Sequence, residues 1–204
     1  MDFKSTNFED AFLITPRVFE DDRGCFYESW NQQLWCAHFR ASGLAVPSFV
    51  QDNHSISAKG VLRGLHFQKA PHQQGKLVQC MVGEIFDVIV DLRPDSASFK
   101  CWQGFYLSSQ NKSQLWVPSG FGHGFLALTD EATVVYKVTE VWNPQAERTL
   151  HWRDPDLAID WPLHLLSSLP HAGHTYPILS SKDSSASRLS ELLPDIVSPS
   201  VVGQ

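Results

Sequence analysis

The sequence lacks several features that mark large classes of protein. It has no basic excess, since 16 Lys and Arg stand against 22 Asp and Glu. Nucleic acids and anionic membranes select basic surfaces, so this balance argues against broad binding to either. No apolar run is long enough to span a bilayer, and no basic segment followed by an apolar core begins the chain. We therefore expect a cytoplasmic protein, whose partner, if anionic, is a small molecule held by a local basic cluster.

Two motifs built on cysteine or histidine are also absent. The four cysteines form no C-x-x-C pair, and a chain of 204 residues can bury a core without disulfides. We expect free thiols in a reducing compartment. No H-x-H pair occurs either, although a facial or octahedral metal site takes two or three imidazoles and a carboxylate. The sequence therefore predicts no catalytic metal.

What the sequence does contain is a series of short apolar runs separated by Gly, Pro, Asn, Asp and Ser. This pattern predicts an all-β fold, a jelly roll that encloses a cavity, as one domain over residues 1–183. Helical spacing occurs around residues 30–43, so few short helices are expected at the periphery. Residues 184–204 are rich in Ser and Pro and are predicted to form a flexible tail or a loosely docked helix. The candidate strands are 12–19, 24–30, 48–57, 60–68, 76–93, 102–108, 114–120, 122–129, 133–142 and 148–152.

The run "GVLRGLHFQ", residues 60–68, sets Arg63 and His66 inside an otherwise apolar strand. An unpaired charge or imidazole is costly to bury, so something must compensate both groups. Either this is an edge strand with solvated polar positions, or both residues face a ligand cavity. Strict alternation puts them on opposite faces, so the second interpretation requires a bulge at Gly64.

A second informative stretch carries Pro118, Gly120 and His123 in a P-x-G-x-x-H spacing. It resembles the second motif of the cupin superfamily, and the alternative is a simple β-turn with a structural histidine. Without the H-x-H pair of metal cupins, chemistry would fall to acids and bases. The titratable candidates in strands or at their ends are His66, Lys76, His123, Tyr136, Lys137, Glu147, Lys182 and Asp183.

Eight ordered blocks between about residues 8 and 183 together resemble the dTDP-4-dehydrorhamnose 3,5-epimerases, non-metal cupins of deoxysugar biosynthesis. The resemblance implies a cupin-type jelly-roll homodimer without a cofactor, whose substrate is a nucleotide-diphosphate 4-keto-6-deoxysugar. The blocks are "DDRGCFYESW", "FVQDNHSIS", "GVLRGLHFQ", "QGKLVQCMVGEIFDVIVDLR", "QLWVPSGFGHGF", "YKVTEVW", "ERTLHWRDPDLAIDWP" and "ILSSKD".

The same resemblance implies the catalytic roles. His66 would abstract the proton, Asp183 would orient it, and Tyr136 would return a proton to the other face. Lys76 would stabilise the enolate oxygen at C4, and Arg63 would pair with the diphosphate or support the base. The residue types suit the chemistry, because protons at C3 and C5 are both alpha to the C4 carbonyl and their removal creates an enolate that needs a positioned cation.

The positional match also implies a set of residues that bind the nucleotide sugar, and exchanged N-terminal strands that let each subunit contribute to its neighbour's site. The family commonly has a tyrosine six residues after the acid, where this chain has Trp142. An indole keeps the aromatic platform and loses the phenol. The implied binding residues are Arg23, Glu28, Gln51, Asp52, Asn53, Arg63, His123, Trp142, Glu147 and Lys182.

The leading hypothesis is a cofactor-free epimerase that converts dTDP-4-keto-6-deoxy-D-glucose to dTDP-4-keto-L-rhamnose. A close alternative is an enzyme that inverts C3 or C5 only, or that uses another nucleotide. Two alternatives come from other classes: a metal-dependent cupin such as a dioxygenase, disfavoured by the missing H-x-H pair, and a non-catalytic sugar-binding jelly roll.

Overall fold

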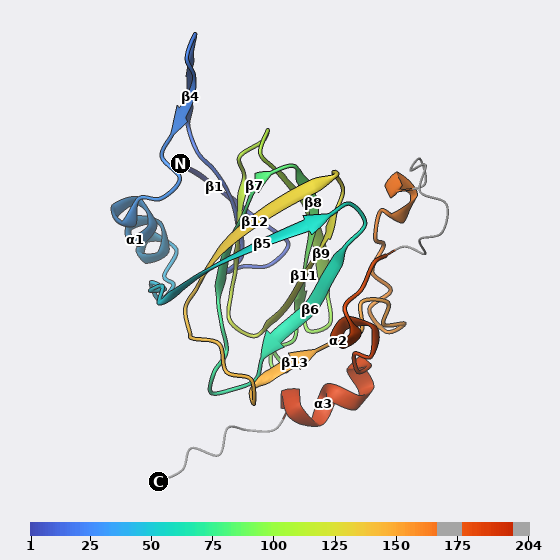
Figure 1. The fold of residues 1–204 in the computed structure, drawn as a ribbon. Coiled ribbons are helices and arrows are strands. Elements are labelled where there is room, and N and C mark those ends of the chain that lie inside the picture. Colours follow the sequence, from blue (N-terminus) through green and yellow to red (C-terminus); the bar gives the residue numbers. More distant parts are fainter. Residues whose placement is uncertain (167–176, 198–204) are drawn as a thin grey trace.

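A computed structural model describes residues 1–166 and 177–197 of the chain (Figure 1). Each predicted run contains a strand, and residues 2–5 form a further strand that was not predicted. The run 12–19 divides into two strands, and the run 76–93 divides at Gly83, whose φ of 75° suits glycine. The strands are β1 (Asp2–Ser5), β2 (Phe12–Thr15), β3 (Val18–Asp21), β4 (Gly24–Tyr27), β5 (Gln51–Ala58), β6 (Leu62–Gln68), β7 (Lys76–Val82), β8 (Glu84–Asp91), β9 (Trp102–Ser108), β10 (Gln114–Val117), β11 (Phe121–Ala127), β12 (Glu131–Val138) and β13 (Glu147–Thr149). The helices are α1 (Gln32–Ala41), the 3-10 helix η1 (Leu163–Leu166), α2 (Ser181–Ser184) and α3 (Leu189–Val197).

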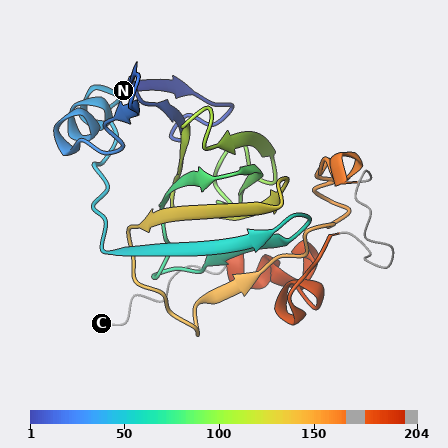
Figure 2. The same ribbon diagram turned by 45° about the horizontal axis from the view of Figure 1, so that its top comes forward.

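The strands form two main antiparallel sheets. One has six strands in the order β1-β2-β10-β7-β12-β5, and the other has five in the order β13-β6-β11-β8-β9. Strands β3 and β4 form a separate hairpin, which projects away from the barrel near the N-terminus (Figure 1). The predicted all-β jelly roll is confirmed. In Figure 2, β5 and β12 run side by side across the front of the barrel, as their register requires.

Alternation along the strands creates an apolar core on each side of the five-stranded sheet. On β8, Ile85 and Ile89 point toward the six-stranded sheet and join a cluster that includes Val78 and Leu115. The intervening Val88 joins a second cluster on the outer face, beneath the C-terminal segments. The barrel is therefore filled by side chains except where polar residues replace this pattern.

Helix α1 confirms the helix predicted around residues 30–43. Its N-cap is Asn31, whose side chain accepts hydrogen bonds from the backbone N–H groups of Gln33 and Leu34. Its apolar stripe buries Trp35 and Phe39 against the outer face of the six-stranded sheet. The helix therefore covers this face over β2, β7 and β10.

The C-terminal segment contains helix α3, which packs on the outer cluster of the five-stranded sheet. Leu189 is fully buried and Leu192 is 6% exposed. The backbone N–H of Leu189 donates to Asp154 at 2.8 Å, and Asp195 pairs with Arg148. The domain boundary expected after residue 183 stays a prediction. The loss of unfolding free energy when Leu189 is truncated would test it.

Two further observations concern cysteines and membrane spans. The four cysteines are free thiols, of which Cys25 and Cys101 are exposed. Among residues 1–166 and 177–197, no helix is long and apolar enough to cross a membrane.

Candidate active site

The strand that carries Arg63 and His66 has a bulge at Gly64, which these two residues need in order to face one cavity. His66 lies opposite His123 of β11 and Arg63 lies opposite Phe125, with a register shift between the two pairs. Gly64 has a φ of 116°, and a Cβ there would lie 2.6 Å from the Cα of Gly124. Only glycine permits this close approach of two strands. The extra residue turns Arg63 and His66 to the same side of the sheet.

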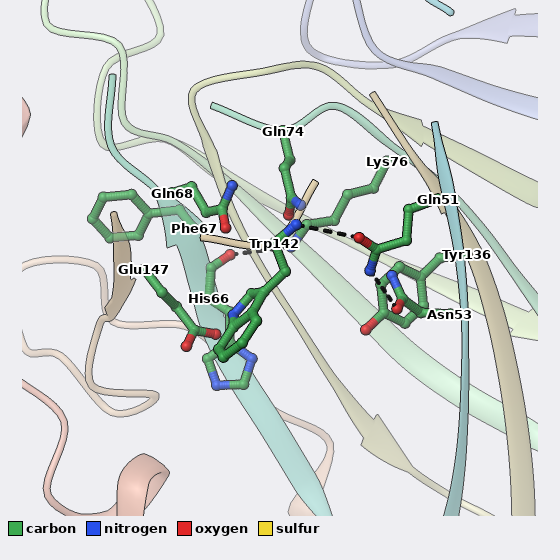
Figure 3. Close-up of a pocket in the computed structure, with 10 residues that line it drawn as sticks. All are labelled: Gln51, Asn53, His66, Phe67, Gln68, Gln74, Lys76, Tyr136, Trp142 and Glu147. Atoms are coloured by element: carbon green, nitrogen blue, oxygen red, sulfur yellow. Dashed lines mark hydrogen bonds between the residues drawn. The ribbon is translucent and has the colours of Figure 1, made fainter. Parts of the chain in front are cut away.

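That side faces a cavity of about 330 Å³ between the two sheets (Figure 3). An adjoining lobe of about 270 Å³ shares His66, Lys76 and Tyr136 with it, and adds Arg63 and His123. Nine of the predicted site residues therefore line one continuous region. The cavity is lined by Gln51, Asn53, His66, Phe67, Gln68, Gln74, Lys76, Tyr136, Trp142 and Glu147.

His66 forms a dyad with Asp183. Its Nε2 lies 2.6 Å from Oδ1 of Asp183, whose side chain is 5% exposed. The second oxygen, Oδ2, accepts a hydrogen bond from the hydroxyl of Ser180 at 2.7 Å. Burial by itself raises the pKa of Asp183, but the hydrogen bonds from His66 and Ser180 outweigh it and the pKa is lowered. The carboxylate therefore stays ionised at neutral pH and orients the imidazole.

Asp183 reaches the dyad because the chain returns to the start of β6 just before it. The N–H of Ile178 donates to the carbonyl of Gly60 at 2.8 Å, and the N–H of Leu62 donates to the carbonyl of Ile178 at 3.0 Å. Helix α2 then begins with Ser180 as its N-cap, which fixes the direction of Asp183. These two backbone hydrogen bonds and the N-cap thus place the carboxylate beside the strand that carries His66.

Lys76 and Tyr136 come from the six-stranded sheet, opposite the wall that holds His66. Lys76 is 6% exposed, and its Nζ donates to the backbone carbonyl of His66 at 3.3 Å. Burial lowers the pKa of Lys76 from 10.5 to about 8, although the carboxylates of Asp87 and Glu147 partly counteract this. Burial also raises the pKa of Tyr136, so its phenol is protonated at neutral pH. The cavity therefore has the imidazole of His66 on one wall, and the amine of Lys76 and the protonated phenol of Tyr136 on the other.

Asp87 is a site residue that the sequence analysis missed. It is fully buried on β8, and its oxygens lie 2.9 and 3.1 Å from Nε2 of His123. Burial lowers the pKa of His123 despite this carboxylate. The signal was present in the sequence, since "IFDVIVD" places a carboxylate in an apolar strand as "VLRGLHF" places Arg63 and His66.

The remaining polar residues of the wall are also paired. Nζ of Lys182 lies 2.6 Å from the carboxylate of Glu147, which lines the cavity. Burial raises the pKa of Glu147, but the paired Lys182 ammonium group and the nearby Trp142 side chain outweigh it and lower that pKa. Arg63 donates to the hydroxyl of Ser57 at 3.0 Å and to a backbone carbonyl at 3.2 Å. These contacts hold charged groups at the cavity without sealing it.

Lys182 reaches the cavity only through its ion pair with Glu147, and three other predicted binding residues do not line the cavity of this subunit. Asp52 lies on the opposite face of β5 from Gln51, and its carboxylate pairs with Lys137 at 3.0 Å. Arg23 lies at the turn of the β3–β4 hairpin, where its side chain is 89% exposed and pairs with Asp21. Glu28 follows directly after β4. The strand alternation accounts for Asp52, and the projecting hairpin accounts for the other two.

The described part of the chain contains no group of three or more His, Cys, Asp or Glu side chains arranged to hold a metal ion. The buried His123 and Asp87 are a pair whose polar atoms are directed at each other.

A model of the dTDP-4-dehydrorhamnose 3,5-epimerase family matches residues 5–191. The chain belongs to this family. It is 54% identical over 157 residues to the dTDP-4-dehydrorhamnose 3,5-epimerase of Escherichia coli (strain K12), a match that covers 77% of this chain and 83% of the relative. It is 52% identical over 174 residues to the corresponding enzyme of Pseudomonas aeruginosa, covering 85% and 88% of the two chains. The family resemblance inferred from the sequence is confirmed, and the protein is an enzyme of the isomerase class.

A solved structure of the same family gives a similar result. The dTDP-6-deoxy-D-glucose-3,5-epimerase of Legionella pneumophila Philadelphia 1, in complex with dTDP-4-keto-L-rhamnose, superposes with a TM-score of 0.83 at 40% sequence identity. The match covers 96% of each chain. The epimerase fold is therefore retained over nearly the whole chain.

Proposed function

We propose that this epimerase inverts C3 and C5 of dTDP-4-keto-6-deoxy-D-glucose and yields dTDP-4-keto-L-rhamnose. The observation that supports this most strongly is the arrangement around one cavity of the His66–Asp183 dyad, the Tyr136 phenol and the Lys76 ammonium group. The substrate is a nucleotide sugar with a ketone at C4, which is the class bound by the Legionella relative. The chemistry requires no cofactor, because the ketone of the substrate makes the neighbouring protons acidic.

In the proposed mechanism, Asp183 occupies Nε2 of His66 and leaves Nδ1 to accept the proton from C3 or C5. The electron pair of the broken C–H bond moves to the C4 oxygen, where the Lys76 ammonium group meets the negative charge. Tyr136 then gives its proton to the opposite face of the same carbon, and the ketone is restored. His66 has gained a proton and Tyr136 has lost one, so exchange with solvent must restore both before the second carbon reacts.

We further propose that the enzyme is a homodimer with exchanged N-terminal strands. Phe19 and Phe26 of the β3–β4 hairpin are 51% and 71% exposed, which a second subunit would cover. The hairpin would carry Arg23 and Glu28 into the partner's cavity, where a guanidinium suits a diphosphate. Trp142, which lines the cavity and is 57% exposed, would offer its ring to the nucleobase.

A mixing experiment tests the shared site. Arg23→Ala and His66→Asn subunits are each expected to form inactive homodimers. In a mixed dimer, one cavity receives an intact hairpin from the partner and also keeps its own base. With random reassortment about a quarter of the wild-type activity should return; no recovery among confirmed mixed dimers would contradict strand exchange.

We propose a cytoplasmic location for the enzyme. All four cysteines are free, and two of them are exposed. Thiols of this kind persist in a reducing compartment. A fractionation of the source cell that finds the enzyme outside the cytoplasm would contradict this.

The central experiment is incubation of the purified enzyme with the 4-keto sugar in heavy water, followed by NMR of the product. Deuterium at both C3 and C5, with both centres inverted, is the expected result. Exchange at one carbon alone would instead establish a single-site epimerase, the alternative raised by Trp142 in place of a tyrosine.

A further inference from the structure

Gln68 is a buried residue of β6 that directs its amide away from the base and toward a loop. Its side chain is on the same strand as His66, two residues later, and the residue is 4% exposed. Nε2 donates to the backbone carbonyls of His72 and Val141 at 2.6 and 3.2 Å. Oε1 accepts from the N–H of Asn143 at 2.6 Å. Both amide hydrogens are therefore committed to the main chain.

Two other glutamines complete the contacts to the same loop. The N–H of Trp142 donates to Oε1 of Gln51 at 3.2 Å, as Figure 3 shows. Nε2 of Gln74 donates to the carbonyl of Glu140 at 2.6 Å. Each of the four consecutive residues 140–143 thus has a backbone group bonded to a glutamine side chain, and all three glutamines line the cavity.

The glutamine contacts matter because the loop of residues 140–143 carries Trp142. Loops exposed to water are normally more mobile than the strands they join. Trp142 is 57% exposed, and its ring lines the cavity near Glu147 (Figure 3). A ring held in one place before the ligand arrives loses less conformational entropy on binding than a mobile ring.

We propose that Gln68 is a positioning residue that fixes the Trp142 loop before the nucleotide binds. The inference rests on the proposed function, in which Trp142 stacks on the nucleobase. Gln68 acts through the loop and has both of its amide hydrogens bonded to backbone carbonyls, so its contribution lies in nucleotide affinity. The proton transfers depend on His66, which pairs with Asp183, and on Tyr136 of another strand, so we expect a change at Gln68 to leave them intact.

The test is a double-mutant cycle on dTDP binding, with Gln68→Met and Trp142→Ala as the single changes. Each variant is expected to weaken dTDP binding about tenfold in calorimetry. Gln68→Met leaves three backbone partners without their amide and frees the loop, and Trp142→Ala removes the ring itself. The double variant should bind no more weakly than Trp142→Ala, since both changes remove the same preorganised ring. In turnover, Gln68→Met should raise KM about tenfold and change kcat less than threefold.

Controls separate this inference from a general loss of structure and from the proposed function. Gln110→Met changes an exposed glutamine remote from the cavity and should leave dTDP affinity unaltered. Gln68→Glu keeps the acceptor for Asn143 and loses the two donors, so intermediate affinity is expected, and it serves in the cycle if the methionine variant does not fold. Additive losses in the cycle, or wild-type affinity in both Gln68 variants, would overturn the inference. Failure of wild-type enzyme to bind dTDP would instead refute the proposed substrate.

Discussion

Nε2 of His66 lies 2.6 Å from Oδ1 of Asp183, although 117 positions separate the two residues in the chain. The carboxylate stabilises the imidazolium that forms when the ring accepts a proton, and it holds the ring in one orientation. Ser180 in turn holds the carboxylate. The orientation of His66 therefore depends on a segment from the C-terminal end of the domain.

The first prediction concerns this dyad. His66→Asn removes the base and should abolish turnover, while dTDP binding measured by calorimetry survives. Asp183→Asn preserves the size of the side chain and loses the charge, so kcat should fall by about 10²- to 10⁴-fold. Unchanged kcat in Asp183→Asn would show that the charge of Asp183 does not assist His66.

The second prediction uses Tyr136. In Tyr136→Phe the base still removes a proton, but nothing on the opposite wall returns one. We expect deuterium from heavy water to enter the substrate with retained configuration, and the inverted product to be lost. Proton NMR of recovered substrate distinguishes these outcomes, and efficient inversion by the phenylalanine variant would assign the acid role to another group.

The third prediction follows from the pKa of Lys76, which burial lowers to about 8. The ammonium form exists below this pH and is the form that meets an enolate, so kcat/KM should fall as the pH rises above about 8. Lys76→Arg keeps its charge at higher pH and should shift this limb upward, whereas Lys76→Met should lower kcat by about 10²-fold or more. The pKa of Tyr136 is raised above 10, so the phenol does not account for a limb near 8. A limb that survives in Lys76→Met would belong to another residue.

The fourth prediction concerns Gly64. In Gly64→Ala the new Cβ would meet backbone atoms at 2.6 and 2.7 Å, at a φ that disfavours any other residue. We expect a loss of about 3 kcal/mol or more in the free energy of unfolding, measured with urea. The matched control is Gly43→Ala, which also has a positive φ but no neighbouring atom within 4 Å, and it should cost about 1 kcal/mol. Equal losses in the two variants would show that the close strand approach contributes nothing.

The fifth prediction tests whether helix α3 is part of the domain. Leu189 is fully buried, so Leu189→Ala should lower the free energy of unfolding by about 3 kcal/mol. Val197 at the end of the same helix is 55% exposed, and Val197→Ala should cost less than about 0.5 kcal/mol. A loosely docked tail would give small losses at both positions.

The sequence predicted the fold and most of the cavity because their signals are local. Apolar runs divided by turn residues revealed the strands, and two polar residues in one apolar run revealed both the active-site strand and its bulge at Gly64. Position in a matching block was a weaker guide. It placed Asp52 in the site, although strand alternation turns that residue outward to Lys137.

Other parts of the site depend on contacts between distant segments, which composition and spacing do not encode. The pairing of Asp87 with His123 joins two strands 36 positions apart. The bonds from Gln68 to the Trp142 loop span 73 and 75 positions. Glutamine has no strong preference for such a role, so only the folded chain revealed it.

The parallel bridge between Val61 and Ile178 has a consequence for how such enzymes diverge. The bridge fixes the backbone against the start of β6 five residues before Asp183. A change in chain length before Ile178 therefore need not shift Asp183 relative to β6. Insertions or deletions before this bridge would leave the carboxylate of Asp183 in register with His66.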